Sequence, residues 1–149
     1  MQKITAQLRF VELPPVHTCD GADISPEIAI EGGDAACYAM MVLNPFEPGC
    51  SFTCWIIWNI DPVPIIPAGL PKVPVLTSPI HAIQGTNDFG EIGYRGPCPP
   101  IGETHRLLFK VYGLAASLDL EPGATKHQLI DAMKGQVVSF GTTEAMYRR

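Results

Sequence analysis

Proline and glycine recur along the whole chain and break it into short segments. There are 15 prolines and 14 glycines among the 149 residues, and they form neither a repeat nor a low-complexity linker. Proline fixes φ and lacks a backbone donor, while glycine adopts turn conformations that other residues resist. This distribution favours short strands joined by many loops over a helical bundle. The length fits one domain, and we expect a single domain over residues 1–149.

The apolar segments have the patterns expected of strands. Residues 4–10 alternate apolar and polar side chains, as a half-buried strand does. Residues 38–43 and 52–60 are almost continuously apolar, which indicates strands buried on both faces. Between these two runs, residues 44–49 predict a turn, because Asn-Pro and Pro-Gly are common turn signals. The chain therefore places two adjacent buried strands in its first half.

A further strand, residues 105–114, directs a histidine toward apolar surroundings. Period-two alternation places His105 on the face of Leu107, Phe109 and Val111. The preceding segment RGPCPPIG contains three prolines and two glycines, and such stiffness lowers the entropy cost of holding a site open. An imidazole can donate, accept or carry charge near pH 7. A ligand partner and a core-edge histidine bonded to a backbone carbonyl are both open for His105.

One helix is expected near the end of the chain. Thr125 and Gln128 have the spacing of a capping box, and apolar residues between Leu129 and Met133 follow at helical spacing. Gly135 supplies a stop, and residues 136–140 predict a last strand. The sequence therefore predicts a mainly β fold with few short helices.

Charge and hydropathy exclude several classes of function. The net charge is -5, and no basic cluster is longer than Arg148-Arg149, so we expect no nucleic-acid surface. No apolar run reaches the roughly 20 residues of a transmembrane helix. The first ten residues alternate polar and apolar, unlike a secretory signal. A cytoplasmic location is the default expectation.

The cysteines and histidines suggest no metal or catalytic motif. The five cysteines are odd in number and lack CxxC spacing, which argues against a disulfide framework or a zinc site. We expect reduced thiols, no metal and no cofactor. Cys54, assigned to the face of Ile56 and Trp58, is interpreted as a buried structural thiol, since reactivity requires a neighbouring cation or base. The remaining histidines are expected on solvated faces: His17, His81 and His127.

The segment TNDFGEIGYRGPCPPIGETHRLLFKVYGL resembles the signature block of the phosphatidylethanolamine-binding protein family. DGADISPEIAI, LNPFEPG, FTCWIIWNI and the helix GATKHQLIDAMKG resemble further family segments in the same order. The chain is similar to the prokaryotic, Raf-kinase-inhibitor-like branch. The resemblance implies an antiparallel, Greek-key-like β-sandwich with a small pocket at one end. In the family this pocket binds anions such as phosphate or the phosphoethanolamine head group, without an established catalytic activity.

Transferred residue by residue, the family's pocket is only partly retained. Its aspartate falls on Asn44 and one strand histidine falls on Cys54, whereas the second histidine is kept as His105. The resemblance also implies a pocket aromatic and a loop whose backbone contacts the anion. The implied ligand-binding residues are Asn44, Phe52, Cys54, Gly96, Pro97 and His105.

These residues predict a ligand-binding or regulatory protein without a catalytic residue. Loss of a carboxylate and of an imidazole leaves fewer charged partners, so we expect small anions to bind only weakly, with a dissociation constant of about 1 mM. One alternative is a Cys54–His105 nucleophile–base pair, with Asn44 as an orienter, in a cysteine hydrolase or redox-sensing thiol protein. Another is a kinase or protease inhibitor module that acts by protein contact. Some relatives associate, which leaves a homodimer open.

Overall fold

A computed structural model gives the fold; it describes residues 1–47 and 50–149, without the side chains of residues 46–50. The chain is mainly β, as predicted. The strand bounds are Gln2–Lys3 (β1), Thr5–Gln7 (β2), Ile28–Glu31 (β3), Cys37–Glu47 (β4), Cys50–Ile60 (β5), Ile65–Ile66 (β6), Val75–Leu76 (β7), Ala82–Gln84 (β8), Thr104–Leu114 (β9) and Val137–Arg148 (β10). The helices are a 3-10 turn, Pro15–His17 (η1), and one α-helix, Lys126–Met133 (α1).

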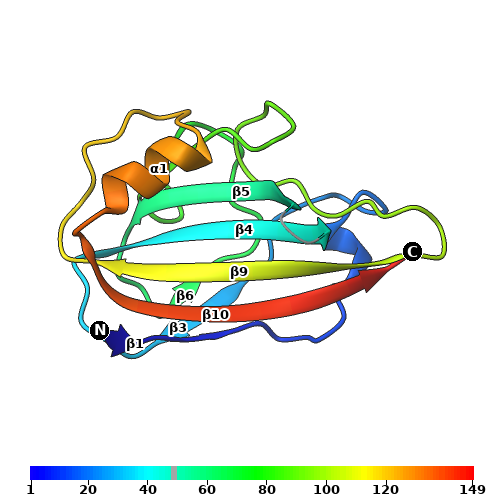
Figure 1. Ribbon diagram of the computed structural model, residues 1–149, viewed down its shortest axis with the longest axis horizontal. Helices are drawn as coiled ribbons and strands as arrows, with labels where there is room; N and C mark the ends of the chain where they lie inside the picture. The colour runs from blue at the N-terminus through cyan, green and yellow to red at the C-terminus, as the bar shows by residue number, and fades with distance from the viewer. Residues whose placement is uncertain (48–49) are drawn as a thin grey trace.

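Two sheets and a helix form three layers (Figure 1). The larger sheet has the order β1-β10-β9-β4-β5-β8-β7, and the smaller one has the order β2-β3-β6. Between the sheets lies a core that includes Trp55 and Phe109, whereas Trp58 belongs to a second core with Leu129 and Met133 of α1. Among the described residues, every strand pair is antiparallel except β1 with β10. The predicted sandwich with one helix near the C-terminus is confirmed.

The strand predicted over residues 4–10 is shorter in the structure, where only Thr5–Gln7 form β2, and a separate strand, β1, precedes it at Gln2–Lys3. β1 pairs with β10 in the larger sheet, and β2 pairs with β3 in the smaller sheet. At Ile4 the chain crosses from one sheet to the other, with its N–H bonded to the carbonyl of Phe140 at 2.9 Å. The predicted alternation survives the crossing, because Ile4 and Ala6 are buried while Thr5 and Gln7 are exposed.

The turn predicted over residues 44–49 is wrong for its first part, and residues 48–49 lie outside the described residues. β4 continues to Glu47, and Asn44 and Pro45 pair with Phe52 and Ser51. The last β4 residue paired with β9 is Leu43, so Pro45 sits on a two-stranded extension. A proline is tolerated there, since the missing N–H costs no bond on the open side. This extension carries Asn44 to the end of the sheet.

A β-bulge at Cys54 reverses the predicted faces of β5. Val42 pairs with Trp55 and Leu43 with Thr53, so Cys54 is the extra residue. A bulge changes which way the following side chains point. Cys54 therefore joins the core between the sheets, whereas Ile56 and Trp58 face α1. The assignment of these three residues to one face was wrong, because period-two alternation assumes an unbroken ladder.

The end of the chain follows the sequence-based expectations more closely. Thr125 and Gln128 form the predicted capping box, with Gln128 Oε1 accepting from the Thr125 N–H at 2.9 Å. The strand predicted over residues 136–140 begins as expected but extends to Arg148. In residues 1–47 and 50–149 no helix is long and apolar enough to cross a membrane.

Candidate functional site

Five of the six predicted ligand-binding residues line one pocket at the end of the larger sheet. These are Asn44, Phe52, Cys54, Pro97 and His105, joined by Phe89 and Cys98. The volume is about 240 Å³, slightly below the usual range for drug-sized ligands. Asn44 comes from the end of β4, and His105 comes from the start of β9. β4 and β9 pair antiparallel, which brings these two ends together.

Three residues, Asn44, Cys54 and His105, form what we call the floor of the pocket. Asn44 Nδ2 lies 3.1 Å from His105 Nδ1. Because an amide NH2 can only donate, His105 Nδ1 is the acceptor in this contact. Asn44 is 7% exposed, and its Oδ1 is buried without a hydrogen-bond partner among the described residues. Such a group costs about 1–3 kcal/mol of stability.

The Cys54 thiol is buried and held in its neutral form. Its Sγ donates a long hydrogen bond of 3.9 Å to the Phe52 carbonyl. Burial, with smaller contributions from the carboxylates of Asp23 and Asp88, raises the pKa of Cys54 to about 12. A nucleophilic cysteine needs the opposite environment, with a lowered pKa. The surroundings of Cys54 therefore favour the structural thiol over the nucleophile.

Gly96 does not line the pocket. Its N–H donates to Asp23 Oδ1 at 2.8 Å, so that donor is already used within the protein. A Cβ on Gly96 would lie 2.0 Å from the His17 carbonyl oxygen, which explains the glycine by close packing. Its neighbour Pro97 has no N–H to offer. The loop backbone that the family resemblance assigns to anion contact is thus committed elsewhere at these two positions.

Phe89 and Cys98 line the pocket but were not among the predicted site residues. The centroid of the Phe89 ring lies 4.5 Å from the centroid of the Phe52 ring in an edge-on arrangement. The Arg95 guanidinium carbon lies 3.9 Å from the Phe89 centroid. Asp88 braces this loop by accepting from the Thr53 N–H at 2.7 Å. An aromatic residue inside the polar turn NDFG was the available signal for Phe89.

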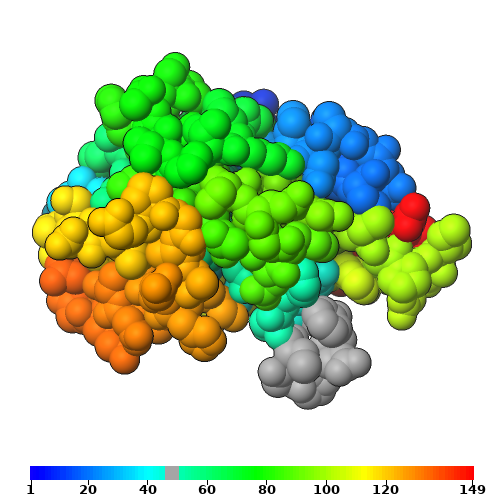
Figure 2. All heavy atoms as spheres, turned by 90° about the horizontal axis from the view of Figure 1, so that it is seen from above, coloured from blue at the N-terminus to red at the C-terminus, as the bar shows by residue number. Residues whose placement is uncertain are grey.

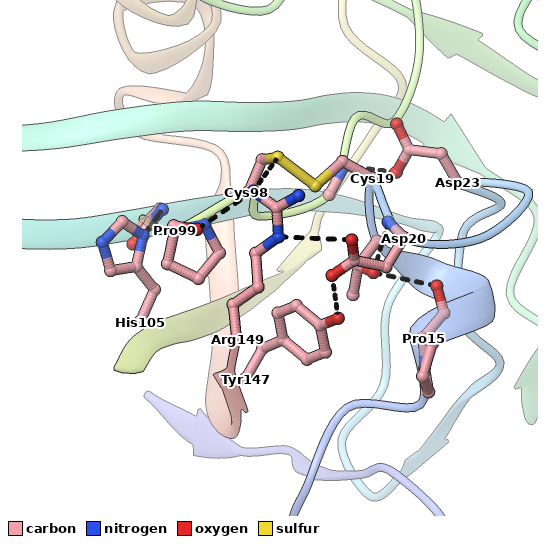
Figure 3. The surroundings of a disulfide bond; sticks show 12 residues. Pro15, Cys19, Asp20, Asp23, Cys98, Pro99, His105, Tyr147 and Arg149 are labelled. Carbon is pink, nitrogen blue, oxygen red and sulfur yellow. Dashed lines mark hydrogen bonds and ion pairs between the residues drawn. A yellow bond between two sulfur atoms is a disulfide. The ribbon is translucent and has the colours of Figure 1, made fainter. Parts of the chain in front are cut away.

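A disulfide between Cys19 and Cys98 corrects the expectation of reduced thiols. We call residues 96–103 the rim, and the bond ties this rim to the loop after η1 (Figure 3). The pair was missed because its members are 79 residues apart, and cysteine spacing alone does not reveal a pairing made by the fold. Of the described cysteines, Cys37 and Cys54 are free and buried.

Tyr147 near the end of β10 and Arg149 just after it support the same loops through polar and charged contacts. Arg149 Nε lies 3.2 Å from Asp20 Oδ1, and Arg149 Nη1 donates to the Pro99 carbonyl at 3.4 Å. The Tyr147 hydroxyl donates to the other Asp20 oxygen (Figure 3). In the space-filling view the rim projects beside the red C-terminal end (Figure 2). The rim is thus attached to two segments distant in sequence.

His17, which we expected on a solvated face, is buried beneath these loops. It is 7% exposed, and its Nδ1 lies 2.8 Å from the Ile24 carbonyl oxygen. The Tyr94 hydroxyl donates to the His17 carbonyl at 2.6 Å. His17 therefore helps to fix the Cys19 loop. His81 and His127 are exposed, as expected.

Metal binding finds no support in the part of the chain that the structure describes. Within it, no group of three or more histidine, cysteine, aspartate or glutamate side chains could hold a metal ion. What the pocket can do chemically is to enclose a small group between aromatic rings, sulfur atoms and one amide–imidazole pair.

The fold and the pocket define a β-sandwich protein with a small ligand-sized pocket at one sheet end. A family profile described as Phosphatidylethanolamine-binding protein matches residues 8–148. The chain therefore belongs to the phosphatidylethanolamine-binding protein family, and the resemblance read from its motifs is confirmed.

Individual relatives agree with this assignment. A UPF0098 protein of Pyrococcus abyssi is 47% identical over 140 residues, which cover 92% of this chain and 79% of that protein. The crystal structure of a putative phosphatidylethanolamine-binding protein homologue of Chlamydia trachomatis is 29% identical, with a TM-score of 0.86 and coverage of 100% and 99%. E. coli YBCL, titled a new member of the mammalian family, is 23% identical with a TM-score of 0.85 and coverage of 99% of each chain, and supports the fold.

Proposed function

We propose that this protein binds a small ligand in the pocket above its floor and acts by binding rather than by catalysis. The observation that carries the proposal is the convergence of Asn44, Phe52, Cys54, Pro97 and His105 on one pocket. These residues come from three strands and a loop, and a buried amide oxygen without a described partner lies among them. A protein retains such a costly group most readily where a ligand uses it.

Weak binding of a phosphate or phosphoethanolamine-like anion is part of this proposal. The neutral Cys54 thiol and the Asn44 amide replace the histidine and aspartate that the family resemblance implies. The Gly96 N–H is engaged by Asp23. With these groups neutral or occupied, an anion has few charged partners, and we expect a dissociation constant of about 1 mM, or about -4 kcal/mol.

The test is a titration of the uniformly labelled protein with inorganic phosphate and with phosphoethanolamine, followed by NMR. We expect shifts at the Asn44 side-chain amide and the His105 ring that saturate in the millimolar range. His105→Ala should remove the saturable shifts at Asn44, whereas His127→Ala, an exposed control, should leave them unchanged. Sub-micromolar affinity would contradict the weak-binding expectation, and no shift with any small ligand would contradict the pocket's function.

The other expectations from the sequence stay predictions. The pKa of Cys54 near 12 disfavours the cysteine hydrolase and the redox-sensing thiol. A pull-down tests for a kinase or protease partner, and analytical sedimentation tests for a homodimer. The cytoplasmic location also stays a prediction, and the disulfide bears on it, because cytosolic disulfides are rare outside hyperthermophiles. Trapping free thiols in intact cells and counting them by mass spectrometry tests it.

A further inference from the structure

The walls of the pocket are mainly apolar. Phe52 and Phe89 face each other edge-on, Pro97 adds a ring without an N–H, and the two sulfur atoms come from Cys54 and Cys98. A charged ligand entering such walls loses its hydration and gains little in return. An uncharged ligand with an aromatic or aliphatic body is stabilised by the same burial.

Two carboxylates that act on Cys54 make the pocket less suited to an anion. Asp23 and Asp88 both act on the Cys54 thiol and disfavour its negative form. A ligand carboxylate or phosphate beside Cys54 would meet the same repulsion. Neither aspartate is among the residues that line the pocket. The Asp23 carboxylate accepts from the Gly96 N–H, and the Asp88 carboxylate accepts from the Thr53 N–H. A ligand cation therefore has no carboxylate among the described lining residues to pair with directly.

The floor offers an acceptor at its base. The Asn44 NH2 group is directed at His105 Nδ1, which leaves Oδ1 as the atom without a described partner. A carboxamide oxygen accepts hydrogen bonds and cannot donate them. Oδ1 is buried, so a ligand N–H or O–H reaches it only when the floor side chains shift, and it then satisfies the oxygen. A ligand that carries acceptors alone would leave it unsatisfied.

We propose that the pocket selects small, uncharged ligands that combine an apolar body with a hydrogen-bond donor for Asn44 Oδ1, in preference to simple anions. This inference rests on the proposed function and names the ligand class for the same site. It differs from the anion expectation because it predicts that an uncharged ligand binds more tightly than an anion of the same shape.

Three probes of nearly equal shape separate charge from hydrogen bonding. Benzamide is uncharged with an N–H donor, acetophenone is uncharged without one, and benzoate is an anion that only accepts. Each is titrated into the intact, oxidised protein at pH 7.5, and shifts of the Phe52, Phe89 and His105 rings are followed by NMR. We expect benzamide to bind roughly tenfold more tightly than benzoate, with acetophenone between them.

Each outcome has a distinct meaning. Benzoate binding as tightly as benzamide overturns this inference but leaves ligand binding at the pocket in place. Equal affinities for benzamide and acetophenone overturn the donor contact to Asn44. If none of the three shifts the pocket residues while phosphate does, the pocket binds anions and the inference is wrong. If neither they nor phosphate shift them, the proposed function itself is wrong.

A variant adds an internal control for the donor contact. Asn44→Leu removes Oδ1, so the ratio of benzamide to acetophenone affinity should fall to about one. The ratio is measured within one variant, so a change in folding stability does not affect it. His127→Ala, on the exposed start of α1, should keep the wild-type ratio. The wild-type comparison of the three probes decides the question even if Asn44→Leu does not fold.

Discussion

The rim and the floor of the pocket are stabilised in opposite ways. The rim is tied down by the disulfide to the Cys19 loop and by Arg149, which donates to the Pro99 carbonyl, and the Tyr147–Asp20 contact anchors the Cys19 loop to β10. The floor contains the neutral Cys54 thiol and the Asn44 amide in an apolar environment, and the amide oxygen has no hydrogen-bond partner among the described residues. The difference indicates that covalent and charged contacts stabilise the loops around the opening. The floor contains an unfavourable buried oxygen, Asn44 Oδ1, which the proposed ligand would satisfy.

The largest expected effect comes from removing the rim disulfide. Cys98→Ser opens a loop that spans 79 residues of sequence, and closing loops of this size stabilises by about 2–5 kcal/mol. Urea unfolding of the oxidised protein should show this loss, and added reductant should shift wild type in the same direction. The double variant Cys19→Ser/Cys98→Ser should not respond to reductant. A wild-type protein indifferent to reductant would show that the bond does not support the rim.

A second prediction concerns Cys54 on the floor. Its pKa is raised from 9.0 to about 12, so at pH 8 its thiolate is roughly a thousandfold scarcer than that of an ordinary thiol. Because the folded state holds this proton more tightly than the unfolded state, its contribution to stability is lost as the pH rises from about 9 toward 12.

Iodoacetamide labelling of the Cys54 peptide, followed by mass spectrometry across pH, measures this. Labelling in urea provides the reference for an ordinary thiol. A midpoint near 8.5 in the folded protein would contradict the neutral Cys54 thiol and would restore the nucleophile hypothesis.

A smaller effect is expected at Tyr147 beneath the rim. Tyr147→Phe removes the hydrogen bond to the Asp20 carboxylate, and bonds to charged groups contribute about 1.5–3 kcal/mol. Thermal and urea unfolding should both register the change. Tyr112→Phe, on β9 outside the rim, is the matched control, with an expected change within about 0.5 kcal/mol. Equal losses in the two variants would mean that the Asp20 contact adds nothing to the rim.

The smallest expected effect is at Asn44. Asn44→Leu loses the bond to His105 but also removes the unsatisfied Oδ1, so the free energy of unfolding should change by no more than about 1 kcal/mol. Asn87→Leu is the contrast, because the Asn87 side chain makes three hydrogen bonds and its loss should cost about 3 kcal/mol. If Asn44→Leu costs as much as Asn87→Leu, the floor is not a site of local cost.

Much of the fold could be predicted from the sequence because it depends on local patterns. The apolar runs before Leu43 and after Phe52, the alternation after His105 and the capping box at Thr125 each reflect neighbouring residues, and each matches the structure. The bulge at Cys54 could not be predicted, since it depends on the register between two strands.

The candidate site was predicted to a similar degree. Asn44, Cys54 and His105 were brought together through the family resemblance, and they do line one pocket. The Cys19–Cys98 bond and the occupied N–H of Gly96 were missed, because both depend on a loop that arrives from another part of the chain. The family resemblance thus brought the floor residues together, whereas the contacts that hold the rim required three-dimensional information.

The bulge in β5 also bears on how this pocket can change during evolution. Cys54 is an extra residue between the pairs Val42–Trp55 and Leu43–Thr53, so the ladder is complete without it. Replacing its side chain alters the chemistry of the pocket without altering any cross-strand pair. Because the ladder does not use this position, a substitution whose side chain fits the buried space can give one scaffold new ligand preferences.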